Sequence, residues 1–328
     1  MIYIKEGNIK NMNTKITASD AAQFFGVTLQ SIHKQLKQKN LISYKNQNRV
    51  YFGHETARDL FKIDFDKKII SFQIVKGGTG KTSITHSLAL RANLYGARVL
   101  CIDIDQQGNL SQAFNVNAKN SPIMIDILAN HLNIQDSIIS ISKGIDIVPS
   151  RIENAVLDNF LMLNKYPLDK VYMELIKDIY QNYDLIIIDC PPALGQSVAA
   201  ATLASDIIIA PVTPEQFSLS GLKISFEEIN TISHRFKKDL CFKIVLNKFD
   251  TRTALSTEVL STILNHELFK NLICNTFIRN CQEFPNAIYS GSNIFATLKN
   301  TTAKEDIDLF TKELLNLNHF NKKNLTAE

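Results

Sequence analysis

The 328-residue sequence lacks the features of a membrane-spanning or secreted protein. No uncharged apolar run approaches the ~20 residues that a transmembrane helix needs, and the N-terminus lacks the apolar core of a signal peptide. The five cysteines are scattered and form no C-x-x-C pair, which argues against disulfides and a cysteine-ligated zinc site. We therefore expect reduced, buried thiols, a cytoplasmic setting and no membrane partner.

Charge is distributed unevenly along the chain. Residues 1–68 hold twelve Lys/Arg and six Asp/Glu, a net charge of +6, whereas the remaining residues hold 24 and 26, a net charge of −2, which together give the +4 of the whole chain. With 45% hydrophobic and 21% charged residues, the composition otherwise fits a globular protein with room for one large and one small domain. The basic segment predicts a polyanionic partner, and a solvated basic face is the alternative.

The basic N-terminal segment has the pattern of two helices joined by a tight turn. Thr17 and Asp20 have the spacing of a capping box at the start of the first helix. Gly26 supplies the positive φ that a tight turn requires, and Thr28 is placed to cap a second helix over residues 29–39. The pattern therefore predicts a helix, a turn and a second helix.

This arrangement favours a DNA-binding unit. Ala22, Gly26 and Ile32 have the relative spacing of the helix-turn-helix signature, in which a small residue, a turn glycine and an apolar core residue recur. Residues 41–52 alternate around Asn-Gln-Asn, which indicates a short β-wing. We expect a winged helix-turn-helix domain over residues 1–66, and a small helical appendage with a basic surface is the alternative.

Polar side chains on the second helix and the wing are candidates for DNA contacts. They can hydrogen-bond base edges and phosphates when such a helix lies in a major groove. The candidates in this segment are Gln30, Ser31, Lys34 and Arg49.

Residues 67–328 have the pattern of a parallel α/β domain. Short β-branched, apolar runs alternate with helical stretches, which is typical of a sheet covered on both faces. The expected strands lie at residues 68–75, 98–103, 144–149, 183–189, 204–212 and 241–247, with a helix at 81–95. We expect a doubly wound, mostly parallel sheet whose ligands bind beyond the carboxyl ends of the strands.

A glycine-rich turn lies between the first of these strands and the helix. It fits the phosphate-binding pattern G-x-x-x-x-G-K-[ST] when the first glycine is relaxed, and its alternative is a glycine turn without phosphate. Lys81 is expected to reach the β- and γ-phosphates of a bound nucleotide, and the Thr82 hydroxyl to ligate Mg²⁺. The expected cofactor-binding residues of the loop are Gly77, Gly78, Thr79, Gly80, Lys81, Thr82 and Ser83.

Three aspartates end two of the expected strands. Asp189 ends a run of apolar residues and is expected to hold Mg²⁺, although an aspartate there can also cap the following turn. Asp103 and Asp105 end the second strand and are expected to position the attacking water or its hydrogen-bond network. This chemistry depends on orientation and charge neutralisation more than on proton abstraction.

Several motifs occur in order between about residues 68 and 300, and together they resemble the ParA/MinD group of ATPases. The segment 76–82, K-G-G-T-G-K-T, looks like the deviant Walker A motif of that group. The segments 103–109 (D-I-D-Q-Q-G-N) and 189–195 (D-C-P-P-A-L-G) resemble two further motifs of the group. The segment 210–222 resembles its P-V-x-P-E-x-x-x-L-x-G-L pattern, and 250–256 resembles D-x-R-T-x-L-S of the partition branch.

The resemblance implies a role for Lys76. In this family two subunits close face to face over two ATP molecules, and the signature lysine of each reaches the phosphates held by the other. Such a cation neutralises charge that develops on the phosphates, so catalysis depends on dimerisation. The resemblance also implies that Asp105 helps activate water, and that Asn247 and the loop at 211–216, with Pro214, flank the adenine.

The resemblance further implies a function in DNA partition. It predicts a nucleoid-associated homodimer that binds DNA non-specifically on ATP, hydrolyses ATP with Mg²⁺ and is stimulated by a ParB-like centromere-binding protein. The N-terminal unit resembles that of plasmid partition ATPases that also repress their own operon. Two alternatives stay open, an ATP-switched transcriptional regulator and a positioning ATPase whose cargo is a protein complex or a membrane site.

Two departures from the family pattern concern the switch segment and the DNA contacts. Gln106 stands where the family usually has proline, and the neighbouring carboxylates of Asp103 and Asp105 are retained. Gln282 replaces a basic residue that the family associates with non-specific DNA contact. Arg252 and Arg279 remain as candidates for that contact, and a solvated arginine is the alternative.

The C-terminal residues 307–320 contain enough apolar residues for an amphipathic helix. A membrane-targeting tail would carry basic residues beside bulky ones, and Asp306, Asp308 and Glu313 oppose that interpretation. We expect this helix to pack on the ATPase domain, which we place at residues 67–328.

Overall fold

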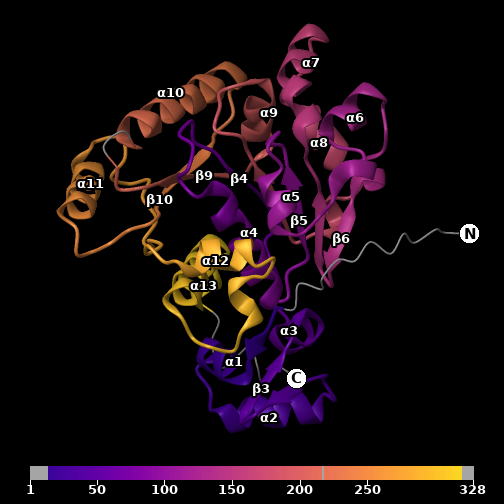
Figure 1. The fold of residues 1–328 in the computed structure, drawn as a ribbon, viewed down its shortest axis with the longest axis vertical. Coiled ribbons are helices and arrows are strands. Elements are labelled where there is room, and N and C mark those ends of the chain that lie inside the picture. Colours follow the sequence, from indigo (N-terminus) through magenta and orange to yellow (C-terminus); the bar gives the residue numbers. More distant parts are fainter. Residues whose placement is uncertain (1–13, 216–217, 320–328) are drawn as a thin grey trace, which may run out of the picture.

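The protein is built around a seven-stranded sheet with helices on both faces (Figure 1). The structure is a computed structural model that describes residues 14–215 and 218–319. The strand order is β10-β9-β4-β8-β5-β7-β6, and every neighbouring pair is parallel except β6 and β7. The strands are β4 (Lys68–Phe72), β5 (Val99–Asp103), β6 (Ile139–Ser142), β7 (Ile145–Val148), β8 (Leu185–Asp189), β9 (Ile207–Val212) and β10 (Cys241–Leu246).

The central strands form because they are short apolar runs that can be buried on both sides. All five residues of β8 are buried, and so are all five of β5. Val99 and Cys101 of β5 join a core on one face of the sheet, whereas Leu100 and Ile102 join a core on the other. This confirms the predicted doubly wound, mostly parallel sheet.

Ten helices of the described residues surround this sheet. They are α4 (Lys81–Leu94), α5 (Asn109–Ala113), α6 (Met124–Ala129), α7 (Leu157–Leu163), α8 (Val171–Ile176), α9 (Gln196–Ala204), α10 (Ser218–Phe236), α11 (Ala254–Asn265), α12 (Glu283–Tyr289) and α13 (Thr302–Leu314). Short 3₁₀ segments lie at η1 (Ala118–Asn120), η2 (Ile134–Ser137), η3 (Ile152–Val156), η4 (Tyr180–Asn182), η5 (Ile294–Ala296) and η6 (Leu317–His319). None of the helices in the described part of the chain is long and apolar enough to cross a membrane.

The N-terminal unit, which we define as residues 14–66, consists of three helices and a three-stranded sheet of order β1-β3-β2. Its elements are β1 (Ile16–Thr17), α1 (Ala18–Phe25), α2 (Leu29–Gln38), β2 (Tyr44–Asn46), β3 (Arg49–Phe52) and α3 (His54–Phe61). The capping box is present, since Thr17 Oγ1 accepts from the Asp20 N–H at 3.0 Å and Asp20 accepts from the Thr17 N–H at 3.1 Å. Gly26 has a φ of 61°, and the Thr28 side chain accepts from the Ser31 N–H, as predicted.

The N-terminal unit shares its hydrophobic core with the domain built on the seven-stranded sheet, next to the C-terminal end of α4. Phe24 and Phe61 contact the buried ring of Tyr95, with centroids 4.8 and 5.8 Å away. A β-carbon on Gly96 would lie 2.6 Å from the Cα of Arg58, so only glycine lets α3 pack this closely. The Arg58 guanidinium donates to the Gly96 carbonyl at 2.6 Å and to Asp184 at 2.8 Å.

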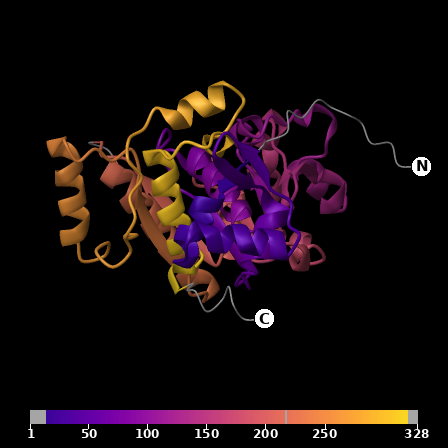
Figure 2. The same ribbon diagram turned by 90° about the horizontal axis from the view of Figure 1, so that it is seen from below.

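Helix α13 completes this joint. Its buried Ile307 and Phe310 belong to the same core as α4, and Figure 2 shows α13 beside the N-terminal unit. Asp308 of α13 pairs with Arg91 of α4 at 2.5 Å, and the Lys312 ammonium lies 5.8 Å from the ring centroid of Phe24. The prediction that the C-terminal helix packs on the domain is confirmed for α13, although residue 320 lies outside the described residues.

Candidate nucleotide-binding site

The glycine-rich turn connects β4 to the first turn of α4 at the carboxyl edge of the sheet. Gly78 and Gly80 have φ values of 74° and 91°, which favour glycine. The Asn247 side chain donates to the Thr79 carbonyl at 2.7 Å, and a β-carbon on Gly80 would collide with that amide. Lys81 is the first residue of α4, so backbone N–H groups of the turn and the helix N-terminus face the same space.

A cavity of about 610 Å³ opens in front of this turn. This volume is within the range of about 300–1,000 Å³ that small-molecule sites occupy. The loop glycines, Lys81, Thr82, Asp105, Asn109 and Asn247 line one side. The sequence did not predict Cys281, Phe284, Pro285 and Ile288, which also line the cavity.

Lys81 lies inside the site. The residue is 6% exposed, and its ammonium lies 3.4 and 3.5 Å from the carbonyl oxygens of Ile74 and Lys76. Burial lowers the pKa of Lys81 from its usual value, and Asp189 acts in the opposite direction. A buried cation with two long hydrogen bonds gains strongly from an anion such as a phosphate group.

Thr82 and Asp189 lie together, as a metal site for Mg²⁺ requires. The Thr82 hydroxyl donates to Asp189 Oδ2 at 2.7 Å, and the Thr85 hydroxyl donates to Oδ1 at 3.2 Å. Burial raises the pKa of Asp189 to about 6, although the hydrogen bond from Thr82 acts in the opposite direction. A hydroxyl and a carboxylate of this kind are hard oxygen ligands, so these residues fit a magnesium ion beside bound phosphates.

Asp103 and Asp105 lie at different depths. Asp105 lines the cavity, whereas Asp103 is completely buried and accepts hydrogen bonds from both the N–H and the hydroxyl of Ser111. Burial, with Asp189 nearby, raises the pKa of Asp103 to about 8. The Asp105 N–H donates to Asp103 at 3.2 Å. Of the two roles predicted for Asp103, its position therefore fits support of the network around Asp105 and not direct contact with water.

Lys76 is not among the residues that line the cavity. Its ammonium donates to Glu215 at 2.5 Å and to the Ser218 hydroxyl at 3.0 Å, and its side chain is 21% exposed. The hydrogen bond from Lys76 lowers the pKa of Glu215. The two lysines of the loop thus have different surroundings, one buried at the cavity and one ion-paired with Glu215.

The two residues expected at the adenine are separated. Asn247 lines the cavity, but Pro214 is not among its lining residues, where Pro192 and the segment 279–285 are found instead. Of this segment, Arg279 was predicted only to contact DNA, and Asn280 follows it directly. Its backbone lies beside the Asn247 loop because the Asn280 N–H donates to the Phe249 carbonyl at 2.9 Å.

The residues predicted to contact DNA differ in their exposure and in their partners within the protein. Gln30 and Lys34 are exposed on α2, Ser31 is half-buried there, and Arg49 on the wing hairpin donates to the Leu298 carbonyl. Outside the N-terminal unit, the two candidate arginines are compensated by acids. Arg252 pairs with Asp250 at 2.7 Å, and Arg279 pairs with Asp306 at 2.5 Å and with Glu305 at 2.7 Å.

The fold and the loop geometry define a P-loop nucleotide-binding protein. A family model described as an AAA domain matches residues 67–242. The chain is 31% identical over 252 residues to a ParA family protein of Chlamydia trachomatis, covering 76% of this chain and 97% of the relative. It is 32% identical over 216 residues to the sporulation initiation inhibitor protein Soj of Bacillus subtilis, covering 64% of this chain and 83% of Soj.

A solved structure has the same fold. It is a putative plasmid partition protein of Borrelia burgdorferi bound to AMPPNP, with a TM-score of 0.64 and 21% identity, covering 76% of this chain and 99% of that one. The chain belongs to the ParA family of P-loop ATPases. ATP and Mg²⁺ are the cofactors to which the residues of the cavity are suited.

Proposed function

We propose that this protein is an ATP-dependent DNA-partition ATPase that closes as a homodimer over ATP. The observation that carries the proposal is the separation of the two loop lysines. Lys81 lines the cavity, whereas Lys76 does not line it and donates to Glu215. A lysine in that position is available to the phosphates of a facing subunit after it exchanges Glu215 for phosphate oxygens.

The residues of the cavity would divide the work of hydrolysis. Lys81 and the loop N–H groups hold the phosphates, and Thr82 and Asp189 hold Mg²⁺, which supplies charge neutralisation at the phosphate oxygens. Asp105, at the cavity wall, orients the attacking water, and Asp103 holds Asp105 in place. Lys76 from the facing subunit adds a cation where negative charge develops.

The N-terminal unit is the best-supported surface for specific DNA in this proposal. Helix α2 has no acidic residue, and it exposes one histidine and two lysines, His33, Lys34 and Lys37. As a winged helix-turn-helix it would bind an operator, and the ATP-bound dimer would hold DNA non-specifically through phosphate contacts. Binding of the second kind should weaken steeply with salt. A ParB-like partner would stimulate hydrolysis and release the dimer from the nucleoid.

The proposal is tested with Lys76→Ala. This variant should bind ATP with unchanged affinity and lose hydrolysis and the ATP-dependent dimer, measured by nucleotide titration, phosphate release and light scattering. Lys223→Ala, which removes an exposed lysine in an i,i+4 pair, is the matched control. Hydrolysis at the wild-type rate in Lys76→Ala would contradict the dimer mechanism.

A second experiment separates partition from positioning. The ATP-bound protein should be retained on plasmid DNA and not on anionic liposomes, and Lys34→Ala should weaken operator binding more than retention on unrelated DNA. Retention on liposomes alone would favour a positioning ATPase with a membrane cargo.

The fixed joint between the N-terminal unit and α4 favours a second candidate, an ATP-switched transcriptional regulator. A footprint at its own promoter that survives Lys81→Ala, with unaffected plasmid inheritance, would support that function over partition.

A further inference from the structure

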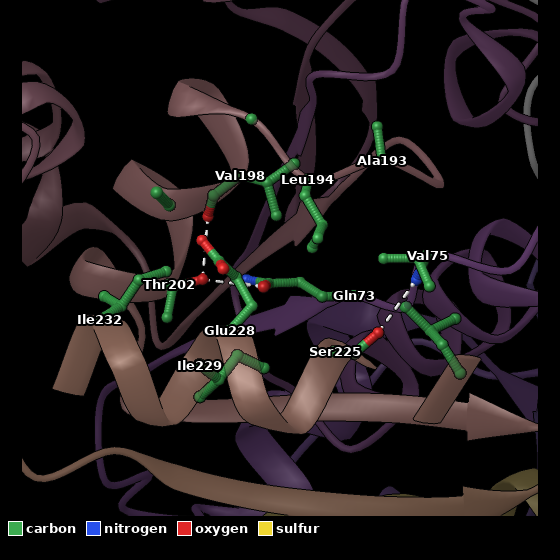
Figure 3. Close-up of a pocket in the computed structure, with 13 residues that line it drawn as sticks. Gln73, Val75, Ala193, Leu194, Val198, Thr202, Ser225, Glu228, Ile229 and Ile232 are labelled. Carbon is green, nitrogen blue, oxygen red and sulfur yellow. Dashed lines mark hydrogen bonds between the residues drawn. The ribbon is translucent and has the colours of Figure 1, made fainter. Parts of the chain in front are cut away.

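Helix α10 packs against the two residues that precede the glycines of the phosphate loop. The contact uses Gly221 and Ser225, which are one turn apart on the buried face of the helix. The Ser225 hydroxyl accepts a hydrogen bond from the Val75 N–H at 3.1 Å, drawn in Figure 3, and donates to the Gly221 carbonyl at 2.9 Å. Ser225 is 3% exposed, so this bond is protected from water.

Gly221 allows the helix to approach Lys76 closely. A β-carbon at this position would lie 3.3 Å from the Cβ of Lys76 and 3.7 Å from Cγ2 of Val75. The first distance is shorter than an ordinary carbon–carbon contact, so any larger residue pushes Lys76 away. Small residues at 221 and 225 therefore set the distance between α10 and the start of the loop.

The same helix and the loop before it also hold the side chain of Lys76. Ser218 is the first residue of α10, and its hydroxyl lies 3.0 Å from the Lys76 ammonium and 3.1 Å from the Thr213 hydroxyl. Glu215 lies in the preceding loop. Helix α10 thus binds the Val75 N–H, directly before Lys76, and also the Lys76 ammonium, whereas the Lys81 ammonium faces the carbonyl oxygens of Ile74 and Lys76.

The space beside Ser225 is small. A cavity of about 20 Å³ lies between α9, α10 and the segment that follows β4. Its polar lining residues Gln73, Thr202, Ser225 and Glu228 are drawn in Figure 3. This is close to the volume that a single water needs. On the α9 side the Thr202 hydroxyl donates to Gln73 at 2.8 Å and does not bond to Val75. The cavity therefore has room for the one methyl group that Ser225→Thr would add, so α10 can keep its position in that variant.

We infer that Ser225 is a positioning residue that acts through Lys76. Its hydrogen bond to Val75, together with the close approach at Gly221, fixes the position from which the Lys76 side chain extends. The inference rests on the proposed role of Lys76 in a facing subunit. It requires that the position of Lys76 can change while the nucleotide pocket around Lys81 stays intact.

The test compares Ser225→Ala and Gly221→Ala with two controls in the full-length protein. Loss of one buried hydrogen bond should lower kcat for ATP about tenfold and leave the Kd for ATP within about twofold. Gly221→Ala should act in the same direction without removing a hydrogen bond. Ser225→Thr keeps the hydroxyl and should restore most of the rate. The controls are Ser220→Ala, exposed on the same helix, and Thr202→Ala, a buried hydroxyl across the cavity.

A double-mutant cycle shows whether Ser225 acts through Lys76. Single-turnover hydrolysis with enzyme in excess is measured in Lys76→Ala and in the Lys76→Ala/Ser225→Ala double variant, together with the thermal midpoint of each. The two should hydrolyse at the same slow rate, because the lysine that Ser225 positions is absent. A further tenfold loss in the double variant, or a Kd for ATP that weakens in parallel with kcat, overturns the inference.

The outcomes separate this inference from the proposed function. If Lys76→Ala loses hydrolysis while Ser225→Ala and Gly221→Ala retain it, the inference is wrong and the proposed function stands. If Lys76→Ala retains hydrolysis, the proposed function is wrong, and the inference is overturned with it.

Discussion

The two ends of α4 have opposite surroundings. At its N-terminus the helix faces a cavity of about 610 Å³, and Lys81 has only long hydrogen bonds to carbonyls among the described residues. At its C-terminus Tyr95 is buried among aromatic rings, and Arg91 is paired with Asp308. The buried cation at the N-terminal end has only long hydrogen bonds, whereas the buried cation at the C-terminal end, Arg91, has a carboxylate partner in the protein.

This difference indicates which end binds a ligand and which is a permanent joint. Backbone N–H groups, glycines with positive φ and a buried cation are an anion site, and they are costly to maintain without an anion. Aromatic packing and a buried ion pair stabilise the folded state without any bound ligand. The N-terminal unit is therefore expected to move with the ATPase body as one piece.

The largest expected effect is at the open end. Lys81→Ala removes the buried ammonium that faces the phosphates, so ATP affinity should fall at least about a hundredfold, as expected for loss of a charge-assisted contact of roughly 3 kcal/mol. Nucleotide titration measures this. The thermal midpoint without nucleotide should not fall, because Lys81 has no strong partner in the protein, and a fall of several degrees would contradict the comparison.

At the joint, Tyr95→Ala should destabilise the fold. Removing a fully buried aromatic ring costs about 3–5 kcal/mol in the free energy of unfolding, which chemical denaturation measures. The matched control is Tyr289→Ala, since Tyr289 is 95% exposed. If the N-terminal unit unfolds alone while the ATPase body keeps its midpoint, the two parts do not form one cooperative piece.

Breaking the ion pair at the joint should have a smaller effect. Asp308→Asn keeps the shape and leaves Arg91 with one buried, uncompensated charge, for which we expect a loss of about 2–3 kcal/mol in stability. ATP affinity should be unchanged. Asp250→Asn, which removes the partner of the exposed Arg252, should change neither quantity.

The smallest expected effect is a pH dependence of the joint. His54 Nδ1 lies 2.9 Å from the Asn93 carbonyl oxygen, which can accept its N–H, and burial, with Arg58 nearby, lowers the pKa of His54 from 6.5. The folded state then binds fewer protons than the unfolded chain below pH 6.5. Stability from this group is therefore complete above pH 6.5 and declines as the pH falls below it. His54→Gln should flatten the decline below pH 6.5 in denaturation experiments at a series of pH values, and His33→Gln, on the surface of α2, should leave it as in the wild type.

The sequence predicted the elements whose signals are local. Each of the six strands expected in the ATPase domain is present, because each is a short apolar run that parallel sheets bury on both faces. The edge strand β6 was missed, since only Ile141 is buried in it and it is half-exposed elsewhere. The loop residues from Gly77 to Ser83, Asp105 and Asp189 were predicted as site residues because a motif fixes their spacing, and all of them except Thr79 and Asp189 line the cavity.

Two parts of the site could not be predicted because they depend on long-range contacts. The wall of the cavity at Phe284 and Ile288 is about 200 residues from the loop, and no apolar pattern marks it as a ligand surface. The ion pairs of Arg279 depend on where α13 lies. The boundary predicted at residues 66 and 67 stays a prediction, and a single hydrophobic core crosses it.

The amino-acid sequence by itself determined the phosphate loop, the order of strands and helices, and the presence of a second lysine at position 76. These follow from local physics: glycine conformations, capping, and the burial of apolar runs. Only the tertiary structure decided that Lys76 does not line the cavity and is held by Glu215 and α10, and that Tyr95 joins the N-terminal unit to the far end of α4. Both depend on which distant segments pack together, because a side chain's partners are set by the fold around it.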